Sequence, residues 1–205
     1  KGKAPAMHCL HQTTPIGKGE PAGLGGKPTL HYAHELAAQG YVCLVPDYPS
    51  FGDYTYDFKR QGATYASGSM KAVWNNLRAV DLLETLPQID PEQIGCIGHS
   101  LGAHNALLTA ALDLRIRAVV SSCGFTAFGD DDLPSWTGDR YMPRIRDRYG
   151  NDPGKVPFDF HEVLAAVAPR PVFVNAPLGD NDFAVSGVKK VVASAAAVYK
   201  LLGAE

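Results

Sequence analysis

The chain has 205 residues, 45% of them hydrophobic, and this length and content allow one α/β domain with its own core. Its formal net charge of −2 gives no basic footprint, which argues against nucleic acid or an anionic membrane surface as a partner. No apolar run approaches the roughly 20 residues of a membrane-spanning helix, and the first residues lack the apolar segment of a signal peptide.

The four cysteines fall in or at the ends of separate apolar runs, without the CxxC spacing of a zinc ligand pair. They are Cys9, Cys43, Cys96 and Cys123. This distribution predicts buried free thiols and argues against both a metal site and a disulfide framework. Unpaired cysteines define no compartment, although they favour a reducing one such as the cytoplasm.

The first part of the chain is predicted to contain two short strands separated by one helix. Residues 6–10 form an apolar strand candidate, and the loop after it, to about residue 28, is crowded with glycine and proline. Residues 29–39 favour a helix that Gly40 closes. Residues 41–46 are predicted to form the second strand, which is expected to be buried.

A long aperiodic segment precedes the next predicted helix. Residues 47–69 are rich in Tyr, Asp, Gly and Ser and predict a long loop, a feature that is usually functional or mobile. With Ser69 as N-cap, apolar residues at helical spacing then predict a helix that Pro87 stops and that covers one sheet face. Residues 90–93 are expected to form a tight turn into an apolar strand at residues 94–99.

The second half of the chain alternates strands with helices. Helices are expected from residue 101 to about residue 112 and from near Ala184 to Gly203. Strands are expected at residues 116–121 and 171–175. This alternation predicts the α/β class, with a mostly parallel sheet, right-handed crossovers and helices on both faces.

One segment, at about residues 125–160, breaks this alternation. It carries Trp136 and Tyr141 together with several prolines and charges of both signs. We interpret it as a cap-like insertion over a pocket, within a single domain of residues 1–205. The alternative is a solvated connection whose aromatic side chains fasten it to the surface.

The segment around Ser100 carries the chemistry. The sequence Gly98-His99-Ser100-Leu101-Gly102 places a serine between two glycines, where an apolar strand meets an Ala/Leu-rich helix. This spacing is typical of a nucleophile elbow, whose glycines permit a strained turn that lifts the serine Oγ above the sheet. The Leu101 N–H then stands at the helix start, where it stabilises an oxyanion. The alternative is a glycine-rich turn with an incidental serine.

The run from Pro91 to Thr126, together with Arg170-Pro171-Val172, resembles the dienelactone hydrolase and prolyl-oligopeptidase-like branch of the α/β-hydrolase superfamily. The resemblance implies an α/β-hydrolase fold of which this chain is a fragment that holds the core strands, the terminal strands being absent. It also implies an esterase that hydrolyses small-molecule carboxylic esters through an acyl-enzyme on a serine. This chemistry requires no metal and no cofactor.

The resemblance places the acidic member of a catalytic triad in residues 176–183. The branch pattern of Arg-Pro, four apolar residues and a short turn leads to Asp180, whereas a looser Gly-x-x-Asp-x-x-Val pattern selects Asp182. We favour Asp180 and keep Asp182 as the alternative acid. Either carboxylate would otherwise serve as a cap for the helix that begins near Ala184.

The second oxyanion donor is expected in the loop after the first strand. His11-Gln12-Thr13 stands where the resembled family has His-Gly-x, so the backbone N–H of Thr13, or of Gln12, is the candidate that complements Leu101. Gln12 replaces the usual glycine of that motif.

No catalytic histidine is identified, because none of the seven histidines follows Asp180, where the resembled family places its base. The base is therefore expected beyond Glu205. A substitute would need hydrogen-bond reach to Ser100 Oγ, and the weaker candidates for that role are His11, His99, His104 and His161. The alternative functions are a hydrolase-like binding protein without catalysis and a peptidase or thioesterase of the same fold.

Overall fold

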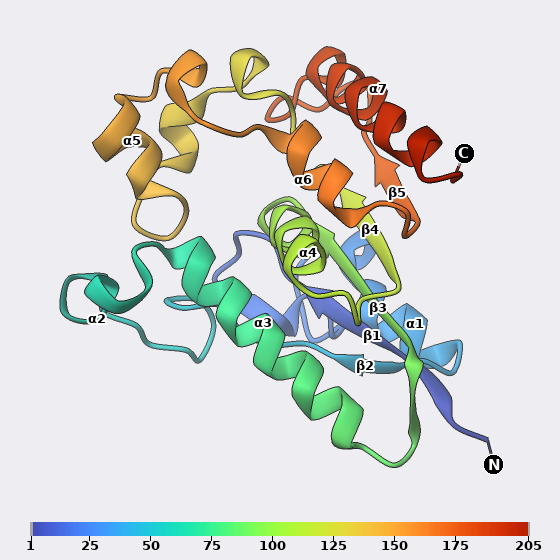
Figure 1. Ribbon diagram of the computed structural model, residues 1–205. Helices are drawn as coiled ribbons and strands as arrows, with labels where there is room; N and C mark the ends of the chain where they lie inside the picture. Colours follow the sequence, from blue (N-terminus) through green and yellow to red (C-terminus); the bar gives the residue numbers. More distant parts are fainter. Residues whose placement is uncertain (1, 205) are drawn as a thin grey trace.

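The computed structural model describes residues 2–204 and contains one five-stranded sheet in the order β2-β1-β3-β4-β5 (Figure 1). All its strand pairs are parallel. The strands are β1 (Ala4–Leu10), β2 (Val42–Leu44), β3 (Ile89–His99), β4 (Ala118–Ser122) and β5 (Val172–Asn175). The predicted α/β class and parallel sheet are therefore confirmed.

Helices cover both faces of this sheet, as predicted. The α-helices are α1 (Tyr32–Ala38), α2 (Phe58–Tyr65), α3 (Gly68–Thr85), α4 (Leu101–Leu112), α5 (Pro143–Tyr149), α6 (Phe160–Val167) and α7 (Val185–Leu201). Short 3-10 turns are found at Gly17–Gly19, Pro28–Leu30, Phe128–Asp130, Leu133–Trp136 and Pro153–Lys155.

The strand order decides which face each helix occupies. The chain runs from β1 outwards to β2 and then returns past β1 to β3 and β4. Right-handed crossovers in these opposite directions place α1 on one face and α3 and α4 on the other. Helices α3, α4, α6 and α7 accordingly pack against one another in succession, while α1 packs against β1 and β2 (Figure 1).

The reversal of direction lies between β1 and β3, which are neighbours in the sheet. Leu10, the last residue of β1, is paired with Gly98 near the end of β3. The loops that leave these two strands therefore begin side by side at the carboxyl edge of the sheet. In open α/β sheets this is where ligands bind.

Helix α4 forms the centre of the core. It is enclosed by the sheet, α3 and α6, which explains why it is largely apolar, with His104, Asn105 and Thr109 as its buried polar residues. Its fully buried aliphatic residues are Leu101, Ala103, Ala106, Leu107 and Ala110. Within residues 2–204, no helix combines the length and the hydropathy that crossing a bilayer requires.

Two local predictions in the middle of the chain are wrong. The expected loop at residues 47–69 contains α2, and the helix after it is capped by Ser67, whose Oγ accepts a hydrogen bond from the Met70 N–H at 2.9 Å. Residues 90–93 belong to β3 and form no turn, although the Asp90 side chain still accepts the Glu92 N–H. They form a bulge in the pairing of β3 with β1. Ala4 pairs with Ile89 and Ala6 with Ile94, so two residues of β1 are matched by five of β3.

Smaller differences concern the first helix and the thiols. The helix expected at residues 29–39 is divided into a 3-10 turn and α1, because His31 has a non-helical ψ of 37°. All four cysteines are free thiols. Cys9 and Cys96 are buried as predicted, whereas Cys43 and Cys123 are only half-buried.

Candidate active site

Ser100 lies in a strained turn between β3 and α4. Its φ of 50° and ψ of −120° lie in a region that side-chain-bearing residues rarely adopt, as a nucleophile elbow requires. The Ser100 N–H donates to the Ser122 carbonyl on β4 at 2.9 Å, and the Ser100 carbonyl accepts from the His104 N–H at 3.0 Å. The turn is thus held by the sheet on one side and by the helix on the other.

The glycines on either side of Ser100 are required by close backbone contacts. A Cβ at Gly98 would lie 2.2 Å from the carbonyl carbon of Gly102. A Cβ at Gly102 would lie 1.9 Å from the carbonyl oxygen of Leu10. The elbow therefore packs directly against the end of β1, where the predicted oxyanion loop begins.

The backbone around the elbow offers donors for an oxyanion. Leu101 is the first residue of α4, so its N–H has no acceptor within the helix and lies at the positive end of the helix dipole. Ser100 makes no capping hydrogen bond, which leaves its Oγ available. Gln12 and Thr13 line one cavity together with Ser100.

That cavity has a volume of about 780 Å³ and opens in front of Ser100. One wall comes from the loop after β1, and the opposite wall from the segment predicted to be a cap. The cap residues that line it are Asp131, Asp132, Ser135, Trp136 and Tyr141. The Tyr141 hydroxyl is 3.1 Å from the Thr13 Oγ1, so the two walls meet.

A second cavity, of about 330 Å³, also reaches Ser100. It is lined by Ser100, His99, Cys123, Asp180 and Asp182, among others. Both predicted acids therefore lie at this smaller cavity, and the exposed Asp182 also reaches the larger one.

The two acids differ in how they are held. The Oδ1 of Asp180 accepts the N–H groups of Asp182 at 2.9 Å and Phe183 at 3.2 Å, which fixes the carboxylate. Its Oδ2 is buried without a hydrogen-bond partner of normal geometry among the described residues, although the Cys123 thiol lies close to the carboxylate, and burial together with this carboxylate raises the pKa of the thiol. A buried carboxylate oxygen without a partner is costly, which marks it as a group prepared to accept a donor.

The imidazole rings of the histidines within the described chain make no hydrogen bond to Ser100 or Asp180. His99 turns to Ser122, with 3.2 Å between Nδ1 and Oγ, and burial lowers its pKa. His104 is fully buried, stacked on Trp136 with ring centroids 5.5 Å apart, and burial lowers its pKa to about 4. His161 is half-buried and pairs with Glu162 at 2.8 Å.

Asp131 is a residue of the larger cavity that the sequence reasoning missed. Burial raises the pKa of its carboxyl to about 7, and the nearby carboxylates of Asp132, Asp159 and Asp182 add to the effect. Its Oδ1 is buried without a partner in the described part of the chain. The only sequence signal is the acidic run at residues 130–132, which by itself predicts a solvated turn.

The fold and the strained turn at Ser100 are those of an α/β hydrolase. The Alpha/beta hydrolase family matches residues 22–201, and the chain belongs to that family. The dienelactone hydrolase branch is a finer assignment than this match supports.

Two curated proteins and one solved structure are similar to the chain. The quorum-quenching protein AidA of Acinetobacter baumannii is 35% identical over 108 residues, which cover 51% of this chain and 34% of AidA. The carbohydrate esterase MZ0003 of an unknown prokaryotic organism is 28% identical over 184 residues, which cover 78% of this chain and 40% of MZ0003. The chain thus spans less than half of the length of either relative.

The solved structure is a carbohydrate esterase family 15 glucuronoyl esterase from Caldicellulosiruptor kristjansonii. It superposes on this chain with a TM-score of 0.73 at 20% identity, over 98% of this chain and 60% of that one. At this identity the likeness concerns the fold alone.

Proposed function

We propose that this chain carries the nucleophile, the acid and the oxyanion donors of a serine hydrolase that cleaves carboxylic esters. The observation that carries the proposal is the strained backbone of Ser100. Its Oγ makes no capping hydrogen bond to α4, and the residue lines both cavities. Ser100 Oγ attacks the acyl carbon, and the Leu101 and Thr13 or Gln12 N–H groups hold the resulting oxyanion. The alcohol leaves with a proton, and water then hydrolyses the acyl-enzyme to the free acid.

The general base of this proposal is a histidine from outside residues 1–205, and Asp180 is the acid that orients it. The 330 Å³ cavity offers the space between Ser100 and Asp180 where an imidazole would reach both. The unpartnered Asp180 Oδ2 would accept the imidazole N–H, which favours the other ring nitrogen as the proton acceptor from Ser100. Asp182, in contrast, is exposed to solvent, so its carboxylate needs no histidine to satisfy its hydrogen bonds.

Within the family, we place the chain in the dienelactone hydrolase and prolyl-oligopeptidase-like esterase branch. The elbow at Ser100 and the Arg170-Pro171 sequence support this assignment. The segment at residues 125–160 acts as the cap in this proposal, because its side chains form one wall of the larger cavity.

The substrate we propose is an ester of a carbohydrate. MZ0003, which is 28% identical over 184 residues, is named a carbohydrate esterase, and this name points to the class. In this chain, Trp136 and Tyr141 provide aromatic surface for a sugar ring. The carboxyl of Asp131 can accept hydrogen bonds from the sugar hydroxyls or, when protonated, donate one to them.

The charge of the larger cavity agrees with a neutral ester. Its lining carboxylates are Glu20, Asp131, Asp132 and Asp182, which outnumber the one lysine, Lys27, and the imidazole of His99. An anionic product acid is repelled by such a wall, whereas the uncharged ester is not. Hydrolysis would thereby favour release of the product.

The test uses the full-length protein that contains this chain. A fluorophosphonate probe should label Ser100, and p-nitrophenyl acetate and methyl glucuronate should be hydrolysed. Ser100→Ala should abolish the label and lower kcat by about 10⁴-fold or more. A folded wild-type protein that neither takes the label nor hydrolyses either ester would support the binding-protein alternative instead.

A matched pair of variants distinguishes the two acids. Asp180→Asn should lower kcat by about 10⁴-fold, because an amide orients the wrong imidazole tautomer. Asp182→Asn, two residues away and exposed, should keep kcat within about threefold of wild type. The reverse result would assign the acid to Asp182.

A further inference from the structure

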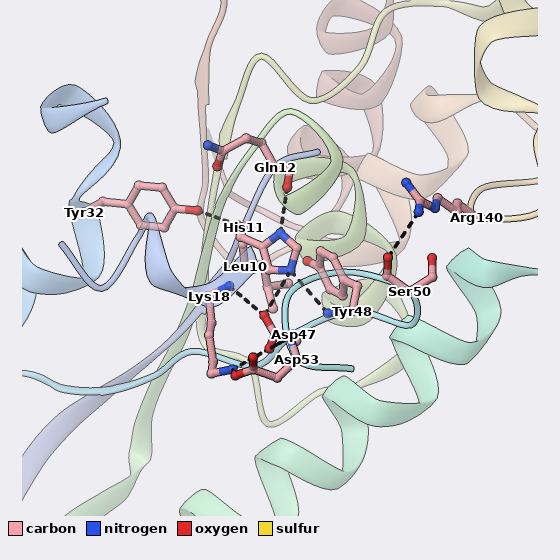
Figure 2. A network of polar contacts seen from close by, with 10 residues as sticks. All are labelled: Leu10, His11, Gln12, Lys18, Tyr32, Asp47, Tyr48, Ser50, Asp53 and Arg140. Atoms are coloured by element: carbon pink, nitrogen blue, oxygen red, sulfur yellow. Dashed lines mark hydrogen bonds and ion pairs between the residues drawn. The ribbon is translucent and has the colours of Figure 1, made fainter. Parts of the chain in front are cut away.

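His11 is the first residue after β1, and its buried imidazole lies within a network of polar contacts (Figure 2). Its Nδ1 is 2.6 Å from the carbonyl oxygen of Gln12, and its Nε2 is 3.2 Å from the backbone nitrogen of Tyr48. The side chain is completely buried, and the Tyr48 ring packs against it with centroids 4.5 Å apart. The ring is therefore fixed in position and orientation.

These contacts determine the tautomer of His11. The Tyr48 N–H can only donate, so the Nε2 atom must accept and carries no proton. The proton of the neutral ring is then on Nδ1, which donates it to the Gln12 carbonyl. Burial lowers the pKa of His11, which keeps the ring neutral, although the nearby Asp47 and Glu20 oppose this effect.

The Gln12 carbonyl belongs to the same peptide as the Thr13 N–H. In a trans peptide the C=O and N–H groups point in opposite directions, so a bond that fixes one also fixes the other. The Thr13 N–H has no acceptor among the described residues, and Thr13 shares the larger cavity with Ser100. The His11 ring thus holds the Gln12–Thr13 peptide at its carbonyl oxygen, while the Thr13 N–H stays free.

We infer that His11 is a positioning residue, which orients the Gln12–Thr13 peptide so that the Thr13 N–H serves as the second oxyanion donor. The inference rests on the proposed function and deepens it, because it selects Thr13 over Gln12. His11 touches no reacting atom. It contributes to catalysis by preorganising a dipole, the mechanism through which oxyanion holes stabilise the transition state.

Asp47 lies 4.0 Å from Nε2, which has no proton to donate to it, so Asp47 supports the ring only through the backbone that it holds (Figure 2). The Asp47 carboxylate accepts the Lys18 N–H at 2.7 Å and the Asp53 N–H at 3.0 Å, and it pairs with the Lys18 Nζ. These bonds hold the chain around Asp47, and with it the Tyr48 N–H that selects the tautomer. The network therefore links β2 to the oxyanion loop.

The first test compares two substitutions at His11 in the full-length protein. Asn carries an amide N–H near the place of Nδ1, whereas Leu has similar bulk and no donor. His11→Leu should lower kcat for p-nitrophenyl acetate by about 10²-fold with KM changed less than about threefold, as for loss of one oxyanion donor. His11→Asn should recover at least a tenth of the wild-type kcat. If the folded His11→Leu and His11→Asn variants have the same kcat as each other, the inference is overturned.

The second test is a double-mutant cycle with Thr13→Pro, which removes the proposed donor itself. His11→Leu should lower kcat no further in the Thr13→Pro background, because the same interaction is already lost. An equal further loss in that background would show that His11 acts otherwise.

The third test requires no activity. Nitrogen NMR of His11 should show a protonated Nδ1 and an unprotonated Nε2, and the opposite tautomer would overturn the inference even in an active enzyme. A protein without any Ser100-dependent hydrolysis would overturn the proposed function, and the inference with it. Normal hydrolysis that is unaffected by His11→Leu would overturn the positioning role alone.

Discussion

Gly102, in the first turn of α4, packs its α-carbon directly against the carbonyl oxygen of Leu10 at the end of β1. A side chain at this position would begin 1.9 Å from that oxygen. Because Leu10 leads into the oxyanion loop and Gly102 follows the elbow, this contact sets the distance between Leu101 and Thr13. The two proposed oxyanion donors are thus spaced by a glycine that touches neither the substrate nor the nucleophile.

Gly102→Ala should therefore impair both stability and catalysis. The added methyl group must push α4 away from β1, which costs about 1–3 kcal/mol or more and widens the oxyanion site. We expect a lower denaturation midpoint in urea and, among molecules that remain folded, a kcat reduced by at least tenfold. Gly129→Ala is the control, because a methyl group there meets nothing within 4 Å. Equal behaviour of the two variants would contradict the spacing argument.

The features that the sequence predicted well are those that depend only on residues adjacent in the chain. The Gly98–Gly102 motif encodes the elbow locally, and alternating apolar segments encode the parallel sheet. The bulge at residues 90–93 was missed because it depends on pairing with β1. The position of His11 was equally hidden, because its contacts with Asp47 and Tyr48 connect segments that only the fold brings together. Propensity and spacing carry no information on such pairings.

Asp131 predicts a pH dependence of stability. Because its pKa is raised to about 7, the folded state binds the proton more tightly than the unfolded state does. Stability is therefore lost as pH rises from the ordinary carboxyl pKa of about 4 towards 7. Asp131→Asn should raise the melting temperature by about 2–4 °C at pH 8 and change it little at pH 4. Exposed Asp139→Asn should show no such difference, and a pH-independent effect of Asp131→Asn would contradict the prediction.

Arg170 predicts a stability effect that is separable from activity. Its guanidinium donates to the carbonyls of Ala110, Asp113 and Ile116 at 2.7 to 2.9 Å, which ties the segment before β5 to the end of α4 and the loop that follows it. Lysine keeps the charge but cannot reach three divergent acceptors. Arg170→Lys should lower the free energy of unfolding in urea by about 1–3 kcal/mol and leave kcat of the folded enzyme unchanged. Arg144→Lys, on the exposed side of α5, provides the control.

His104 predicts how the protein responds to acid. Burial between Trp136 and Phe160 lowers its pKa to about 4, below the ordinary value of 6.5. Between these two pH values the unfolded state therefore binds a proton on His104, whereas the folded state does not. Stability is then lost as pH falls from 6.5 towards 4, by an amount on the order of 3 kcal/mol for this one residue. His104→Phe keeps an aromatic ring in the stack and removes the titration, so its unfolding free energy should fall less steeply over this range. His161→Gln, at a half-buried position beside Glu162, is the control. If His104→Phe has the same slope as wild type, then other groups, such as the equally buried His8, dominate acid unfolding.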